Sequence, residues 1–264
     1  SVSRDRTKFK LAPYALPAGS WYVVRLQVVH TESQADSFAS VTVSVDPGNL
    51  VSLVAGGSQQ SVRLGEPLLL DGSGSFDEDV PGVTGAAMEF VNFEWSCIQL
   101  QPAYSTVCPF PLTPLATDRS IGMVDARNLS TGEGIVARVT LEVAGTARAG
   151  SSSVDVLVVG AETPSLSVTS LSGPTNPGER LLLTGRVSTT APCVGKWNIS
   201  DTGFDLAAAA LTAVTISIPS QSVAYPVNLV LGADSLSAQA TYRFTLFCGT
   251  GVAVVDVEVN GPPQ

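Results

Sequence analysis

Residues 154–158 read Val-Asp-Val-Leu-Val, a run in which every second side chain is Val. A period of two is typical of a β-strand that buries one face. The same Val-x-Val-x-Val ending recurs at residues 41–45 and 255–259, each time after another alternating stretch and a polar turn. Each copy therefore predicts an antiparallel hairpin, followed by a linker that contains Pro or Gly.

The spacing of these endings predicts the domain organisation. Val45, Val158 and Val259 lie roughly 100 to 115 positions apart, which is about the size of one β-sandwich domain. Each hairpin is interpreted as the last two strands, F and G, of such a domain. We therefore expect an all-β chain of tandem immunoglobulin-like or fibronectin III-like β-sandwiches, with boundaries at 1–48, 49–161 and 162–264. The first segment is expected to be only the C-terminal half of a domain, because one hairpin cannot bury its own core.

Charge and hydropathy argue against nucleic-acid binding and against a membrane span. The net charge of −9 and the pI near 4.5 give the field the wrong sign for binding nucleic acid. The most apolar stretch, residues 206–218, is interrupted by hydroxyl side chains and is shorter than the ~20 residues needed to cross a bilayer. We expect no membrane span within this chain.

The four cysteines predict disulfides. None of them forms a Cys-x-x-Cys pair, which argues against a zinc ribbon or a thioredoxin-like site. Sequence alone permits three pairings. We favour Cys97 with Cys108 and Cys193 with Cys248, because each pair then stays inside one proposed domain. Reduced thiols in a cytosolic protein are the alternative.

Two tryptophans lie close to cysteines in predicted strands. Alternation places Phe93, Trp95 and Cys97 on one side of a strand, and Trp197 follows Cys193 by four positions. A Trp beside a Cys on strand C is a recurrent core feature of immunoglobulin-like sandwiches, so Trp95 and Trp197 are predicted core residues. The alternative is an exposed aromatic platform for sugars.

Residues 68–79 read Leu-Leu-Leu-Asp-Gly-Ser-Gly-Ser-Phe-Asp-Glu-Asp, and Trp-Ser-Cys follows at residues 95–97. This pattern resembles the PKD-like modules in the receptor-for-egg-jelly (REJ) region of polycystin-1-type proteins. The resemblance implies that 49–161 is a PKD-like or REJ β-sandwich in the ectodomain of a large membrane protein, on the extracellular side of the plasma or ciliary membrane. It also implies as partners the neighbouring immunoglobulin-like domains, a polycystin-2-like channel or an extracellular glycoprotein.

The acidic loop within this segment is a candidate calcium site. Asp71, Asp77, Glu78 and Asp79 supply the oxygen ligands that calcium prefers. The favoured interpretation is structural, because Asp and Ser beside Gly cap turns through their own backbone and the loop lacks EF-hand spacing. We therefore expect no metal and no cofactor.

Two sequons are candidate glycosylation sites. Asn128-Leu129-Ser130 and Asn198-Ile199-Ser200 accept N-glycans if the chain is secreted. Asn198 follows a Trp predicted to be buried, so its side chain is expected to project outward.

Catalysis is not expected. The chain has one histidine, His30, and no nucleophile elbow, P-loop or dinucleotide fingerprint. The sequence predicts a non-catalytic extracellular segment that acts as a rigid spacer and as a surface for adhesion to proteins or glycans. The alternative is an accessory carbohydrate-binding module of a secreted enzyme.

Overall fold

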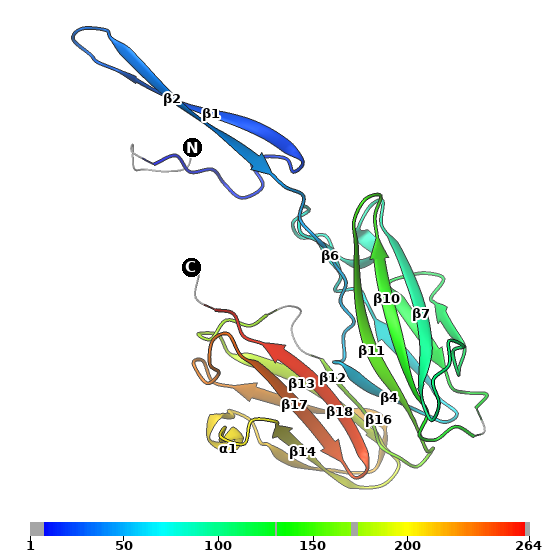
Figure 1. Cartoon of the computed structure of the whole chain (residues 1–264). Helices are drawn as coiled ribbons and strands as arrows, with labels where there is room; N and C mark the ends of the chain where they lie inside the picture. The colour runs from blue at the N-terminus through cyan, green and yellow to red at the C-terminus, as the bar shows by residue number, and fades with distance from the viewer. Residues whose placement is uncertain (1–7, 130, 170–173, 262–264) are drawn as a thin grey trace.

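A computed structural model of the chain describes residues 8–129, 131–169 and 174–261. These residues form a projecting hairpin and two β-sandwiches (Figure 1). In the described ranges, no helix is long and apolar enough to cross a membrane. The expected class, an all-β chain of tandem immunoglobulin-like or fibronectin III-like sandwiches, is confirmed.

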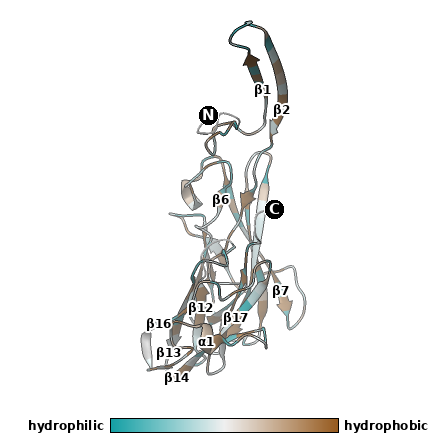
Figure 2. Ribbon diagram, turned by 90° about the vertical axis from the view of Figure 1, so that its left-hand side faces the viewer, coloured by the Kyte–Doolittle hydropathy of each residue, from teal (hydrophilic) through white to brown (hydrophobic). Residues whose placement is uncertain are grey.

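The hairpin consists of β1 (Ser20–Val29) and β2 (Asp36–Val45), which pair along their whole length. It extends away from both sandwiches (Figure 1), and hydrophobic residues run along both of its strands (Figure 2). Seven of its Trp, Phe, Leu and Val side chains are at least 49% exposed to solvent in β1 and β2: Trp21, Val23, Leu26, Val28, Val29, Phe38 and Val41.

The middle sandwich has two principal layers. One layer is a three-stranded sheet in the order β5, β9, β8, with bounds Pro67–Asp71, Ile121–Asp125 and Leu112–Pro114. The other is the run β4, β11, β10, β7, with bounds Gln59–Arg63, Ala149–Val159, Val136–Ala144 and Asn92–Gln101. Two shorter features lie at one end of this sandwich. Strand β3 (Leu50–Val51) pairs with β6 (Phe76–Asp77), and a 3₁₀ turn, η1 (Gly85–Ala87), follows.

The C-terminal sandwich repeats this plan. Its three-stranded sheet has the order β12, β13, β16, with bounds Ser165–Thr169, Leu181–Thr189 and Gln221–Leu231. The facing strands run β15, β14, β17, β18, with bounds Thr215–Ile218, Cys193–Ile199, Thr241–Cys248 and Gly251–Glu258. One turn of helix, α1 (Leu206–Ala209), begins after Asp205, whose side chain accepts a hydrogen bond from the Ala208 amide.

One strand joins the two sandwiches into a continuous sheet of eight strands. Strand β4 runs parallel to β11 over five residue pairs, from Asp155↔Gln59 to Val159↔Arg63. On its other edge, Gln59 pairs with Val254 of β18. Residues 60–63 are all buried, so β4 has no face in water.

The predicted alternation accounts for the hairpins inside both sandwiches. In β10, Ala137, Val139 and Leu141 are fully buried, whereas Arg138 and Glu142 on the opposite face are exposed. In β17, Phe244 and Leu246 are fully buried in the same way. Burial of one face of each strand therefore forms the core of each sandwich.

Each sandwich core is built on a Trp that covers a Gly of the facing sheet. An added Cβ at Gly122 would come within 2.8 Å of the Trp95 ring, and one at Gly185 within 3.0 Å of the Trp197 ring. Both indoles donate a hydrogen bond to a backbone carbonyl, Trp95 to Arg119 at 3.0 Å and Trp197 to Val227 at 3.2 Å. This partner satisfies the one polar atom of each indole.

We expect Gly122→Ala to destabilise the middle sandwich by about 1–3 kcal/mol, because the new methyl group forces the Trp95 ring to move. Urea unfolding followed by tryptophan fluorescence measures the change. Gly74→Ala is the control, since a Cβ there meets its nearest neighbour at 3.9 Å. Equal stability of the two variants would contradict the proposed packing.

Candidate structural joint and interaction surfaces

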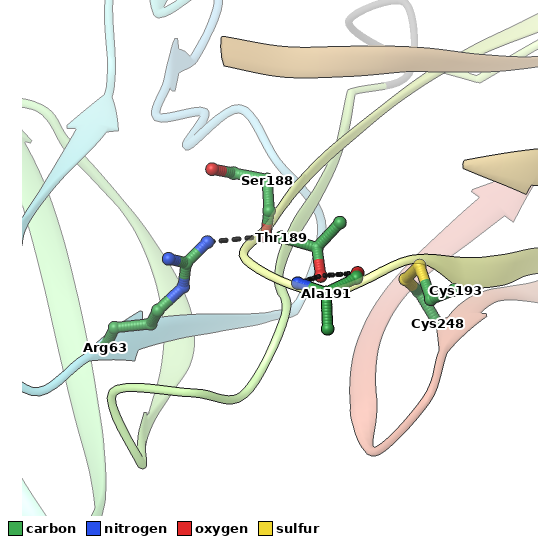
Figure 3. Close-up of a disulfide and its surroundings, with 6 residues drawn as sticks. All are labelled: Arg63, Ser188, Thr189, Ala191, Cys193 and Cys248. Carbon is green, nitrogen blue, oxygen red and sulfur yellow. Dashed lines mark hydrogen bonds between the residues drawn. A yellow bond between two sulfur atoms is a disulfide. The ribbon is translucent and has the colours of Figure 1, made fainter. Parts of the chain in front are cut away.

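The joint between the two sandwiches is centred on Arg63 at the end of β4. Arg63 is 5% exposed, and its guanidinium group hydrogen-bonds to two acceptors. One guanidinium nitrogen donates to Glu66 at 3.2 Å, and the other donates to the backbone carbonyl of Ser188 in the C-terminal sandwich (Figure 3). A buried cation that binds a carbonyl of the neighbouring domain fixes the relative position of both.

The end of β13 that receives Arg63 is itself held in place. The Thr189 hydroxyl donates to the Ala191 carbonyl at 2.6 Å, and the Cys193–Cys248 disulfide follows directly (Figure 3). These contacts restrain the backbone of Ser188, which accepts the hydrogen bond of Arg63.

A second tie lies at the start of β4. The Ser58 hydroxyl donates to Asp256 of β18 at 3.1 Å, and Arg243 donates to both oxygens of the same carboxylate. The hydrogen bond from Arg243 lowers the pKa of Asp256 below its ordinary value of 3.8, with a smaller contribution from Ser58. Asp256 therefore stays ionised and able to accept at neutral pH.

Gly57 allows this close approach. Its φ is +85°, and an added Cβ would collide with the backbone carbonyl of Val254. Only glycine fits without strain where φ is positive and a neighbouring strand passes this closely.

The acidic loop forms a second cluster, in which Arg148 binds the carboxylates. Arg148 donates to both oxygens of Asp77, at 3.0 and 2.8 Å, and to Asp79 at 2.9 Å. It also donates to the Gly48 carbonyl at 2.7 Å, in the linker that follows the hairpin. The hydrogen bond to Asp77 raises the pKa of Arg148, so the guanidinium stays charged.

Backbone amides donate to three carboxylates of this loop. Asp79 accepts from the Gly48 amide at 3.0 Å, and Glu78 accepts from the Asn49 amide at 2.7 Å. Asp71 instead caps its own turn by accepting from the Ser73 amide at 2.9 Å. In the part of the chain that the structure describes, no group of three or more His, Cys, Asp or Glu side chains is placed to hold a metal ion. The loop fastens the linker at Gly48 and Asn49 to the middle sandwich.

The structure pairs Cys97 with Cys108 and Cys193 with Cys248, and all four cysteines lie inside the sandwiches. Cys248 is fully buried and the other three are partly buried. Trp197 is 2% exposed and Trp95 is half-buried, so both rings face the cores and neither forms an exposed platform.

The candidate glycan acceptors lie on the surface. Asn198 and Ser200 are exposed, on and directly after β14, with Trp197 and Ile199 buried beside them. Asn128 is also exposed, and its sequon partner Ser130 lies outside the described residues. His30 lies in the exposed turn of the first hairpin, where its Nδ1 contacts the Ser33 hydroxyl at 2.9 Å. This is a local turn contact.

A cavity of about 650 Å³ opens at the end of the middle sandwich that faces the hairpin linker. Leu50, Val83, Met88 and Val91 line it, with Arg148 at its edge. Phe90 stands at the rim, 90% exposed and with a φ of +60°.

The sequence analysis missed Arg63 and Arg148, the two cations that organise these sites. An excess of carboxylates in residues 71–79 signals that a counter-charge is needed, but the position of that charge depends on the fold. For Arg63 the one local signal is the run Gln-Gln-Ser-Val-Arg at 59–63, which lacks the period of two found in the other strands.

We expect Arg148→Ala to destabilise the middle sandwich by about 1–2 kcal/mol, a value moderated by the 32% exposure of the side chain. Amide exchange at residues 48–49 is expected to accelerate, because the linker loses its anchor. Arg138→Ala removes an exposed pair with Asp155 and is the control, with an expected cost below about 1 kcal/mol. Unchanged exchange at the linker would contradict the role of Arg148.

The two disulfides are expected to contribute unequally. They close loops with sequence separations of 11 and 55 residues, for which chain entropy gives about 3 and about 4 kcal/mol. Replacing Cys193 and Cys248 by Ser is therefore expected to lower the unfolding free energy by about 1 kcal/mol more than replacing Cys97 and Cys108. Urea titration of both double variants checks the order, and a reversed order would contradict it.

Among solved structures, titin domains Z1Z2 in complex with telethonin are 11% identical, covering 82% of this chain and 98% of that chain with a TM-score of 0.26. The N-terminal eight Ig domains of Down Syndrome Cell Adhesion Molecule are 10% identical over 92% and 33%, with a TM-score of 0.29. An endo-fucoidan hydrolase from glycoside hydrolase family 107 is 11% identical over 91% and 34%, with a TM-score of 0.28. TM-scores this low support no conclusion about function or domain arrangement.

No curated protein matches the chain. The profile of the REJ domain family matches residues 2–264, which is nearly the whole sequence. This match agrees with the REJ resemblance that the sequence suggested. The chain belongs to the REJ domain family.

Proposed function

We propose that the chain is a non-catalytic extracellular segment that acts as a rigid spacer and interaction surface in a large polycystin-1-like membrane protein of the cell surface or cilium. Two disulfides and membership of the REJ family are consistent with an extracellular domain. The polycystin-1-like parent and the ciliary or plasma membrane follow from the sequence resemblance at residues 68–79 and 95–97.

One observation carries the proposal, namely the burial of β4 between two sandwiches. A flexible tether would leave its residues in water, whereas Gln60, Ser61, Val62 and Arg63 are all at most 5% exposed. The eight-stranded sheet, the Arg63 to Ser188 contact and the Ser58 to Asp256 contact hold the pair of sandwiches at one angle. Such a pair transmits position and orientation between the segments attached to its ends.

The units of this spacer are proposed to be residues 1–48, a half-domain that contains the hairpin, then the sandwiches of 49–161 and 162–264. The middle unit is proposed to be PKD-like because of its acidic loop. In that unit Asp77 and Asp79 already bind Arg148, so the role we propose for the loop is structural and requires no calcium.

The interaction surface is proposed to be the outer faces and loops, since Trp95, Trp197 and the four Cys side chains of the two sandwiches are turned into the cores. Only 14% of residues are charged, so neighbouring immunoglobulin-like domains, an extracellular glycoprotein or a polycystin-2-like channel would meet a weakly charged surface. N-glycans at Asn128 and Asn198 would restrict binding to the remaining faces.

The test of rigidity is Gly57→Ala in the complete chain. We expect the added methyl group to separate β4 from β18, so that small-angle X-ray scattering shows a broader distribution of distances and NMR relaxation shows two independently tumbling sandwiches. Gly82→Ala is the matched control, because Gly82 has a similar φ of +74° but no atom within 4 Å of an added Cβ. Independent tumbling of the unaltered chain would contradict the spacer function.

A further inference from the structure

Residues 13–28 share several backbone features with residues 233–248 of the C-terminal sandwich. Two unusual backbone angles align without any insertion: Tyr14 and Asp234 have φ of 58° and 59°, and Gly19 and Gln239 have φ of 72° and 60°. A tyrosine follows three positions later in both segments: Tyr22 follows Gly19, and Tyr242 follows Gln239. A non-glycine residue at positive φ is uncommon, so the match of Tyr14 with Asp234, together with the second positive φ at Gly19 and Gln239, indicates a shared local structure.

The two tyrosine hydroxyls hydrogen-bond to the backbone at corresponding loop positions, although in opposite directions. The Tyr22 hydroxyl donates to the Pro17 carbonyl at 3.1 Å, and the Tyr242 hydroxyl accepts from the Ser237 amide at 3.0 Å. Each bond spans five residues. A tyrosine at the start of strand F that bonds back to the preceding loop is the tyrosine corner of immunoglobulin-like sandwiches. Strand β1 is therefore a strand F, entered from a strand E.

Strand pairing extends the match. Leu26 pairs with Ala39 and Val24 with Val41, as Leu246 pairs with Ala253 and Phe244 with Val255. The four residues of the C-terminal sandwich are at most 2% exposed, whereas Leu26 is 64% and Val41 is 58% exposed. The positions that form a core in one unit are open in the other.

We define the inner face of the hairpin as the ten side chains that these pairings place on one side: Ser20, Tyr22, Val24, Leu26, Val28, Ser37, Ala39, Val41, Val43 and Val45. None of them carries a charge. The outer face already has polar partners of its own, because Arg25 lies 3.8 Å from the Phe38 ring centre and Gln27 donates to Asp36 at 2.6 Å. The outer face also exposes apolar side chains, Trp21 and Val23 among them, but it mixes them with charged groups. The inner face has no charged side chain and matches the core positions of the C-terminal sandwich, so it is the side that we expect to be covered.

We propose that the inner face binds the remaining strands of its own immunoglobulin-like sandwich, contributed by the polypeptide that enters the structure at Phe9. Phe9 and Leu11 correspond to Leu229 and Leu231 at the end of β16, both fully buried. Phe9 and Leu11 thus occupy positions equivalent to the end of a strand E, and the sheet that such a strand completes would cover the inner face. This inference rests on the proposed half-domain at residues 1–48.

The pairing pattern also specifies one residue of the occupant. In both complete sandwiches the core Trp of strand C lies opposite a Leu of strand F: Trp95 with Leu141, and Trp197 with Leu246. Leu26 is the equivalent Leu of the hairpin. The strand that pairs with the free edge of β1 therefore has a Trp opposite Leu26.

The test extends the chain at its N-terminus with the preceding ~60 residues of its parent polypeptide, the amount that completes a domain of ~100 residues. We expect a monomer in which amide exchange of residues 20–45 slows at least 100-fold relative to the unextended chain. Binding of a hydrophobic dye is expected to fall, because the inner face is covered. A Trp in the added segment is expected to become buried in the same transition.

Matched variants locate the effect. Leu26→Asp in the extended chain is expected to abolish protection of residues 20–45 while residues 49–261 stay protected. Val23→Asp is the control, because Val23 lies on the outer face and is 69% exposed, close to the 64% of Leu26. This variant is expected to leave the protection of residues 20–45 intact. Val23 corresponds to Arg243, which is exposed in the C-terminal sandwich.

Two results would overturn the proposal. The first is a monomeric extended chain whose hairpin exchanges as fast as before. The second is protection that appears only with dimerisation, through the inner face of a second copy. Neither result bears on the joint at Gly57, so the spacer function and the half-domain are tested separately.

Discussion

Strand β4 has no side in water, and the other contacts of the joint follow from this constraint. Its edges are taken by β11 and β18, and both of its faces lie within protein. The Arg63 guanidinium, which water would otherwise solvate, must then find its partners in the protein. Glu66 and the Ser188 carbonyl accept from its two terminal nitrogens, while its Nε is buried without a partner. The end of β13 that offers this carbonyl is followed by the Thr189 hydrogen bond and by a disulfide. Loss of the Ser188 contact would leave a second nitrogen of this buried cation unpaired.

Charges in this chain are few and several have structural roles. Arg63 and Arg148 each bridge segments far apart in sequence, and Arg243 orients Asp256 toward Ser58 across the joint. Each of these guanidinium groups binds carboxylates or carbonyls at two or more points, an arrangement that lysine cannot reproduce. An acidic, weakly charged protein can in this way fix its domain geometry with three arginines.

The sequence predicted what is encoded locally. A period of two and a recurring valine ending were enough to predict the three hairpins, because a strand with one buried face alternates apolar and polar residues. Strand β4 lacks this alternation, since the two sandwiches together bury both of its faces. The acidic loop was interpreted as structural from its turn residues, whereas Arg148, which binds it, lies about 70 residues away and contacts it only through the fold. The tyrosine corner at Tyr22 was present in the sequence, and its meaning became clear only from the backbone angles shared with residues 233–248.

The parallel pairing of β4 with β11 has a mechanical consequence. The polypeptide enters β4 at Gln59 and leaves β11 at Val159, at opposite ends of one parallel ladder. A pull along the chain therefore slides the two strands past each other, and all five residue pairs bear the load together. Antiparallel neighbours pulled from one end would instead open one bond at a time. The middle sandwich is thus loaded in shear, the direction in which a β-ladder resists extension most strongly.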